Sequence, residues 1–236
     1  MTTSDLRNLS YVLGSTVHGP MIVMRWDSRG ASNEILNTGA HEPEEIKQMM
    51  PWVAALRQQR QGRIVAIDGG ANVGTWTLAL AKTLHGWGEV YSFEPQRRLF
   101  YALCGNIALN NRHNVHAKNQ ALSNRIGQIE VAQLEVDSDN AMSTLNLLNQ
   151  PGGSHPREYV PEVTIDSLGL DVGFIKLDIE GMESRALAGA VKTIERCRPL
   201  VFMEVWMSNV SDIQAMLPGY RMEALPDPRN AIFWPE

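Results

Sequence analysis

Three charged side chains alternate with apolar ones near the end of a single apolar stretch. The stretch reads Phe174-Ile-Lys176-Leu-Asp178-Ile-Glu180-Gly181, and strand alternation places Lys176, Asp178 and Glu180 on the same side. A central parallel strand is normally apolar on both faces, so charges at its carboxyl end indicate the crevice where open α/β sheets bind ligands. Carboxylates and an amine there can orient a substrate heteroatom or take up its proton. These three residues form the candidate catalytic group. The alternative is a structural Lys176–Asp178 ion pair with Glu180 and Glu183 capping the next helix.

A second set of candidate residues lies in a glycine-rich turn. The apolar run 64–67 predicts a buried strand, Asp68-Gly-Gly70-Ala-Asn72-Val-Gly74 follows it, and the chain to residue 82 predicts a helix. The first amides of a helix have no intrahelical partners, and glycines let a ligand approach the backbone closely. We therefore expect a nucleoside-containing cofactor at this turn.

Spacing and charge separate two classes of such cofactors. A dinucleotide fingerprint ending at Gly74 needs a glycine at position 71, which is Ala71. Asp68 suits an ammonium group and would repel a pyrophosphate. The pattern D-x-G-x-x-x-G instead resembles the S-adenosylmethionine (SAM) loop of class I methyltransferases, with Asn72 where many of them have a middle glycine. An NAD-dependent oxidoreductase is the second interpretation, and a strand–turn–helix without a ligand is the third.

A carboxylate also follows the next predicted strand. Residues 88–93 are followed by Glu94-Pro95, twenty residues beyond Gly74. A carboxylate at the tip of the neighbouring strand can accept hydrogen bonds from both ribose hydroxyls of a bound nucleoside. The alternative is a charge at a helix N-terminus, stabilised by the helix dipole. Ala121 and Leu122, after the third strand predicted at 115–121, are expected to line the adenine.

The remaining pattern predicts the elements that position these residues. Residues 1–60 are expected to form an N-terminal cover or lid, with a strand at 17–26 and a helix at 42–59. Residues 61–236 are expected to form one α/β domain. Its further elements are listed here in chain order: a helix at 95–110, a strand at 128–134, a helix at 182–196, a strand at 199–205, and a closing hairpin at 220–225 and 231–234. The polar segment 137–161 predicts a long loop that encloses a second substrate, with Pro151 and Gly152-Gly153 as a hinge and His155 and Arg157 facing the substrate. The alternative is a solvated linker.

Composition restricts the partners and the compartment. The 236-residue chain contains 44% hydrophobic residues and has a formal charge of −5. Because of this negative charge, it offers no broad attraction to phosphate backbones or anionic membranes. Nucleic acid is therefore disfavoured as a substrate. The two cysteines, Cys104 and Cys197, have neither metal nor redox spacing. With no signal peptide or membrane span in the pattern, we expect a cytoplasmic protein.

Several separated stretches together resemble the FkbM family of SAM-dependent methyltransferases. The matching pieces are Asp68-Gly-Gly-Ala-Asn-Val-Gly74, Phe93-Glu94-Pro95, Ala121-Leu122-Ser123, Asp139-Asn140 with Ser143-Thr-Leu145, Val163-Thr-Ile-Asp166-Ser-Leu168, and Ile175-Lys176-Leu-Asp178-Ile-Glu180-Gly181-Met-Glu183. The resemblance covers about residues 40–206. It departs from the family pattern at Gly69, where Ile or Val is usual, and at Met182, where Phe is common.

The resemblance implies a fold, a cofactor and a reaction. The fold would be a doubly wound, Rossmann-like α/β fold with a seven-stranded sheet whose last strand is antiparallel. The cofactor would be SAM, held by Asp68, Gly70, Asn72, Gly74, Glu94, Ala121 and Leu122. The reaction would be methyl transfer to a hydroxyl, or to an amide or amine nitrogen, of a small metabolite, sugar or peptide intermediate, without a metal. A non-catalytic SAM-binding module remains an alternative, and a homodimer remains open.

Overall fold

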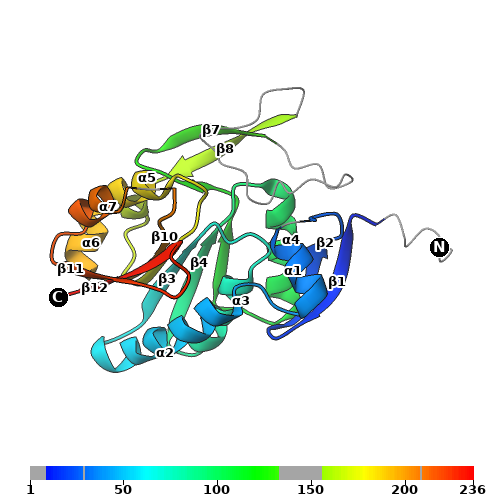
Figure 1. Ribbon diagram of the computed structural model, residues 1–236, viewed down its shortest axis with the longest axis horizontal. Helices are drawn as coiled ribbons and strands as arrows, with labels where there is room; N and C mark the ends of the chain where they lie inside the picture. Colours follow the sequence, from blue (N-terminus) through cyan, green and yellow to red (C-terminus); the bar gives the residue numbers. More distant parts are fainter. Residues whose placement is uncertain (1–8, 29, 133–155, 208) are drawn as a thin grey trace.

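A seven-stranded sheet with helices on both faces forms the centre of the protein (Figure 1). The computed structural model describes residues 9–28, 30–132, 156–207 and 209–236. Across the sheet, the strands are β11 (Tyr220–Ala224), β12 (Asn230–Pro235), β10 (Leu200–Glu204), β9 (Val172–Leu177), β3 (Ile64–Gly69), β4 (Gly88–Phe93) and β5 (Val115–Lys118). All neighbours pair in parallel except β12, which is antiparallel to both β10 and β11. The predicted doubly wound sheet with an antiparallel last strand is therefore confirmed.

The strand order reverses at β3, and this positions the functional residues. The chain runs from β3 outward through β4 to β5, and then returns to add β9 and β10 on the other side. In such a sheet the crevice beyond the carboxyl ends of the strands at the reversal is the expected ligand site. The glycine-rich turn leaves β3 at this point, and Asp178 comes directly after β9.

Alternate residues of the central strands face two different helical layers. Ile64, Ala66 and Phe174 pack with α2 (Pro43–Gln59) and α3 (Thr75–Thr83). Ile67 and Ile175 face the opposite way and pack with α5 (Glu183–Ala188), α6 (Val191–Cys197) and α7 (Val210–Met216). Figure 1 shows these two layers on either side of the sheet. Because both faces are covered, β3 and β9 are apolar except at Asp68 and Lys176, near their carboxyl ends.

The N-terminal segment shares its core with the rest of the protein. It contains an antiparallel hairpin, β1 (Tyr11–Thr16) and β2 (Gly19–Met24), then α1 (Ala31–Thr38) and α2. Residues of β2 and α1 pack with Leu78 of α3 and Leu99 of α4 (Arg97–Leu109). The buried Asn106 amide donates to Ile22 O at 2.9 Å and to Val73 O at 2.8 Å. This side chain connects the hairpin to the turn that follows β3.

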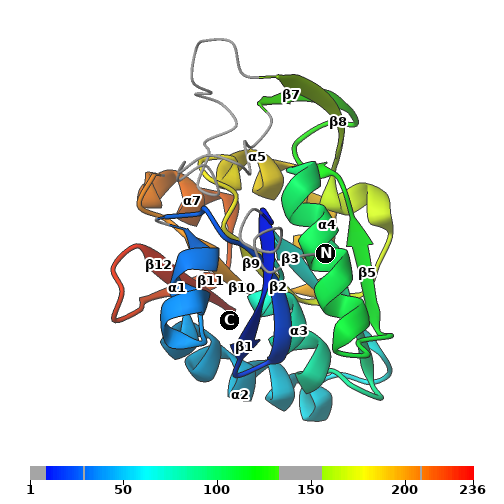
Figure 2. The ribbon, with the colours of Figure 1, turned by 90° about the vertical axis from the view of Figure 1, so that its right-hand side faces the viewer.

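A small second sheet stands beyond the main one (Figure 2). It contains β6 (Ala121–Leu122), β8 (Arg157–Val163) and β7 (Gly127–Ala132) in that order. A short 3-10 helix, η3 (Ile165–Leu168), follows β8. Arg157 begins β8, and its guanidinium donates to Glu130 at 3.0 Å. The predicted hinge and His155 lie outside the described residues.

Several predicted boundaries were wrong. The helix at 182–196 is two helices, because Asp166 accepts from the amides of Lys192 and Thr193 at 3.1 and 2.7 Å and caps a new helix there. The strand at 115–121 ends at Lys118, and Ala121–Leu122 pairs with β8 instead. The strand at 17–26 is the shorter β2, while β1 and α1 were not predicted.

Candidate active site

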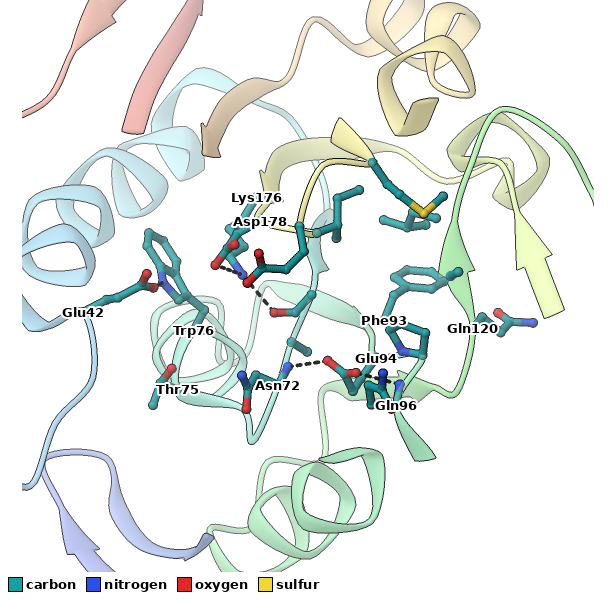
Figure 3. Close-up of a pocket in the computed structure, with 18 of the residues that line it drawn as sticks. Glu42, Asn72, Thr75, Trp76, Phe93, Glu94, Gln96, Gln120, Lys176 and Asp178 are labelled. Atoms are coloured by element: carbon teal, nitrogen blue, oxygen red, sulfur yellow. Dashed lines mark hydrogen bonds and ion pairs between the residues drawn. The ribbon is translucent and has the colours of Figure 1, made fainter. Parts of the chain in front are cut away.

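A cavity with about 760 Å³ of open space lies at the carboxyl ends of β3, β4 and β9 (Figure 3). Eight of the predicted site residues line it: Gly70, Asn72, Glu94, Ala121, Leu122, Lys176, Asp178 and Glu180. Asp68 and Gly74, which were also predicted, do not line the cavity. Strands far apart in the sequence therefore bring most of the candidates together.

Close backbone contacts shape the glycine-rich turn. Gly70 has φ +74°, and a Cβ there would lie 1.8 Å from Asp178 O. The amides of Gly70 and Ala71 both donate to Phe93 O at 3.0 Å. Gly74 has φ +100°, and a Cβ there would meet Leu103 at 2.8 Å. The turn is thus held against β4 and the end of β9, while Gly74 serves the packing of α3 on α4.

Glu94 is fixed at the cavity by backbone amides. Its side chain accepts from Asn72 N at 2.8 Å and from Gln96 N at 2.7 Å, and only 4% of the residue is exposed. Burial raises the pKa of Glu94 to about 7, although these two amides and Lys176 act in the opposite direction. Each carboxylate oxygen keeps acceptor capacity beyond one amide bond, so the group can still accept hydroxyl donors.

Gln96 adds a donor that the sequence analysis missed. It lines the cavity, is 6% exposed, and its Nε2 has no hydrogen-bond partner among the described residues. A buried polar atom is normally hydrogen-bonded, so this amide favours a ligand with an acceptor close to Glu94. A nucleoside offers ribose and base acceptors, and this end of the cavity therefore fits one. No sequence signal identifies Gln96, because its role depends on where the first turn of α4 is placed.

Lys176 connects the turn after β3 to the end of β9. Its Nζ donates to Gly69 O at 3.2 Å and to Gly70 O at 3.0 Å, and lies 3.4 Å from Asp178 Oδ2 and 3.7 Å from Asp68 Oδ1. Burial lowers the pKa of this amine, but the carboxylates of Asp178, Asp68 and Glu42 outweigh it and the pKa is raised overall. The structural ion pair considered above is therefore present, and it lies within the cavity wall.

Asp68 points into the protein interior. It is fully buried, its Oδ2 accepts from Thr77 Oγ1 at 2.5 Å, and its Oδ1 faces Lys176. Burial raises its pKa despite the nearby amine. The sequence placed this carboxylate at the strand tip, where it lies, but strand alternation did not show that it turns toward α3 and Lys176.

Asp178 and Glu180 lie on the turn after β9. The strand ends at Leu177, and Glu180 adopts φ +55°, so the alternation assumed from the sequence does not extend through this turn. Asp178 is one quarter exposed. Burial and then Asp178 raise the pKa of Glu180 to about 7. Glu183 is buried, and its Oε1 accepts from the amides of Ile179 at 2.8 Å and Gly181 at 3.4 Å, so it organises this turn.

Backbone strain is concentrated around the cavity. Within the described ranges, five non-glycine residues have a left-handed backbone, and three of them, Glu42, Asn72 and Glu180, line the cavity. Such conformations cost free energy and persist where the surrounding structure imposes them, as at functional sites. Most of the strained non-glycine residues therefore belong to the cavity wall.

The N-terminal segment contributes residues that the sequence analysis did not assign to the site. His41 and Glu42 line the cavity just before α2. The Glu42 carboxylate accepts from Trp76 Nε1 at 2.6 Å, and His41 Nδ1 lies 2.6 Å from Glu34 Oε2. The sequence offered only an acidic, proline-containing helix start, which many helices have. Within the described residues, no group of three or more His, Cys, Asp or Glu side chains could hold a metal ion.

These pKa shifts predict a pH dependence of stability. The pKa of Glu180 rises from 4.5 to about 7 on folding. Between these values the folded protein keeps a proton that the unfolded chain has lost, so this group destabilises the fold progressively as pH rises through the window. We expect Glu180→Gln to gain melting temperature relative to the parent as pH rises from 5 to 8, measured at constant ionic strength. If the difference in melting temperature between Glu180→Gln and the parent stays constant or decreases as pH rises, the raised pKa of Glu180 is contradicted.

The comparisons with known proteins agree with the fold. A family model described as the methyltransferase FkbM domain matches residues 68–227. The solved FkbM methyltransferase from Methylobacillus flagellatus KT is similar with a TM-score of 0.53 and 18% identity, over 86% of this chain and 52% of that one. The chain thus spans about half the length of that relative.

Two further solved structures are similar at lower scores. The tRNA (uracil-54, C5)-methyltransferase of Pyrococcus abyssi in complex with S-adenosyl-L-homocysteine has a TM-score of 0.48 and 14% identity, over 95% of this chain and 44% of that one. A putative rRNA methylase from Clostridium thermocellum has a TM-score of 0.47 and 9% identity, over 80% and 92%. No curated protein matches the chain. No described helix is both long and apolar enough to cross a membrane. Because the FkbM model matches well over half of its length, the chain belongs to the FkbM methyltransferase domain family.

Proposed function

We propose that this protein is a SAM-dependent methyltransferase that modifies a hydroxyl, or an amide or amine nitrogen, of a small metabolite, sugar or peptide intermediate. One observation carries the proposal: a single cavity joins the glycine-rich turn, the Glu94 carboxylate and the Asp178–Glu180 turn, in a chain of the FkbM family. The cavity would thus have a nucleoside end, at Glu94, next to a reaction end, at Asp178 and Glu180.

The residues at the nucleoside end fit the cofactor. Glu94 would accept hydrogen bonds from the two ribose hydroxyls. Gln96 Nε2, which has no hydrogen-bond partner in the part of the chain that the structure describes, belongs to the same cavity lining. Ala121 and Leu122 supply a small apolar surface for the adenine. Four carboxylates line the cavity against the single amine of Lys176, which favours a cationic ligand over a pyrophosphate.

At the other end of the cavity, the carboxylates after β9 would serve the acceptor. When bound, SAM supplies a methyl group activated by its sulfonium. A hydroxyl acceptor must also lose a proton, and Asp178 or Glu180 can hold it, since the pKa of Glu180 near 7 suits a general base. Lys176 would fix Asp178 and the turn after β3 in place, because its Nζ is already surrounded by oxygen atoms.

Calorimetry tests the cofactor assignment. We expect SAM and S-adenosylhomocysteine to bind and NAD not to bind. Glu94→Ala removes hydrogen bonds from a charged acceptor to the ribose, so affinity for S-adenosylhomocysteine should fall roughly ten- to a hundredfold, or about 1.5–3 kcal/mol. Glu89→Ala is the matched control, because Glu89 lies on β4, the strand that Glu94 directly follows, but contacts Arg63 and His116 instead of the cavity.

Two results would count against the assignment. Unchanged affinity in Glu94→Ala would mean that this carboxylate does not bind the ribose. Binding of NAD but not of S-adenosylhomocysteine would favour the oxidoreductase alternative. The cytoplasmic location, the homodimer and the boundary between segments 1–60 and 61–236 stay predictions.

A further inference from the structure

We propose that Glu42, from the N-terminal segment, binds the α-ammonium group of the cofactor's methionine moiety, the role that the sequence assigned to Asp68. The inference rests on the proposed function and specifies which residue recognises the amino-acid end of the cofactor. It also gives the segment before β3 a direct part in cofactor recognition.

Asp68 is poorly placed for that role. Its carboxylate is fully buried, does not line the cavity, and is bonded to Thr77 and faces Lys176. Lys176 Nζ already lies 3.7 Å from Asp68 Oδ1, and it also donates to the carbonyl oxygens of Gly69 and Gly70. Asp68 therefore already has its cation within the protein.

Glu42 lies in the cavity wall and is held in place. It directly precedes α2 with φ +51°, a conformation that the surrounding structure must impose on a non-glycine residue. The bond from Trp76 Nε1 at 2.6 Å fixes one carboxylate oxygen. Helix α2 packs on α3 through buried apolar residues, so the carboxylate has a rigid support.

The order of groups in the cofactor matches the order of groups along the cavity. In Figure 3, Glu42 and Trp76 lie on one side of Asn72, and Glu94, Gln96 and Gln120 lie on the other. In SAM the ribose stands between the adenine and the methionine moiety. With the ribose at Glu94 and the adenine toward Gln120 and Leu122, the methionine end extends back past Asn72 toward Glu42.

The electrostatics around Glu42 favour a further cation. Burial raises the pKa of Glu42, and the nearby Asp178 carboxylate raises it further, while His41 and Lys176 offset part of this. An ammonium group next to Glu42 would stabilise its ionised form. The acidic wall thus complements the positively charged end of the ligand.

The competing explanation is purely structural: Glu42 would only hold α2 against α3 through Trp76. To separate the two, we would measure the affinities of S-adenosylhomocysteine, its deaminated analogue and 5′-methylthioadenosine by calorimetry. The proteins would be the parent, Glu42→Gln, Asp68→Asn, Trp76→Phe and the exposed-site control Glu44→Gln. Gln keeps the size of Glu42 and an acceptor for Trp76 but removes the charge.

We expect Glu42→Gln to weaken S-adenosylhomocysteine binding roughly ten- to a hundredfold, as for a lost hydrogen bond between charged groups. Its affinities for the deaminated analogue and for 5′-methylthioadenosine should equal those of the parent. Asp68→Asn should keep the parent's preference for the ammonium-bearing ligand, and this arm tests the exclusion of Asp68 even if Glu42→Gln does not fold.

Other outcomes would overturn the inference. Equal losses for all three ligands in Glu42→Gln, reproduced by Trp76→Phe, would show a structural role. Loss of the ammonium preference in Asp68→Asn would return the role to Asp68. If the parent binds 5′-methylthioadenosine and S-adenosylhomocysteine equally well, no residue recognises the ammonium. If it binds neither, the proposed function itself fails.

Discussion

Replacing Lys176 by Met is expected to lower the free energy of unfolding by about 3–5 kcal/mol, because it leaves the Asp68 carboxylate buried without its cation. The side chain is 2% exposed, and its amine also donates to the carbonyl oxygens of Gly69 and Gly70. In a chain of this size the loss corresponds to a decrease in melting temperature of roughly 6–20 °C. Urea unfolding monitored by circular dichroism would measure it.

A double variant provides the control. Lys176→Met combined with Asp68→Asn removes both charges and should recover part of the lost stability, because the remaining amide is neutral and can still accept from Thr77. If Lys176→Met unfolds like the parent and binds S-adenosylhomocysteine equally well, Lys176 does not hold the turn. We would then assign Lys176 to direct contact with the acceptor.

Either Asp178 or Glu180 would take the proton of the acceptor. Of the variants Asp178→Asn and Glu180→Gln, the one that removes this proton-accepting group is expected to lower turnover by about 10²–10⁴-fold. Both variants keep the shape of the side chain and should retain S-adenosylhomocysteine binding, since Glu94 and Gln96 lie at the nucleoside end. Turnover would be measured with labelled SAM on an acceptor identified by screening hydroxyl- and amine-bearing metabolites. Equal losses in kcat and kcat/KM would indicate an interaction made in the transition state.

Asp171→Asn is the matched control for this pair. Asp171 is exposed and lies immediately before the amino end of β9, the strand that leads to Asp178. It should leave turnover unchanged. If both Asp178→Asn and Glu180→Gln keep near-parental turnover, these carboxylates are not the base. If the parent binds SAM but transfers no methyl group to any acceptor, the non-catalytic binding module becomes the better interpretation.

The tertiary contacts of the N-terminal segment also change how the predicted cover is understood. Its apolar residues share two of the hydrophobic cores with α3, α4 and the central sheet. Its polar residues His41 and Glu42 form part of the cavity wall. This segment therefore both lines the cavity and packs against the rest of the fold.

The sequence by itself determined the central sheet and the tips of its strands. The apolar runs at β3, β9 and β10 are buried on both faces, and such runs show in sequence because nearly every position before the strand tip is apolar. Gly70, Asn72 and Glu94 could be identified because a turn or an acid directly after such a run lies at the carboxyl edge of a parallel sheet. These are local signals of residue type and spacing.

Only the tertiary structure decided which way each polar group points and what it meets. Asp68 and Lys176 differ little from Asp178 in sequence pattern. The first two are buried and bonded to Thr77 and to backbone carbonyls, while Asp178 is partly exposed. Glu42 and Gln96 enter the cavity because α2 and α4 pack where they do, and no local pattern encodes that packing. Strand alternation gives a face, but the direction of a side chain beyond the strand end depends on backbone dihedrals such as those of Glu180, which long-range contacts impose.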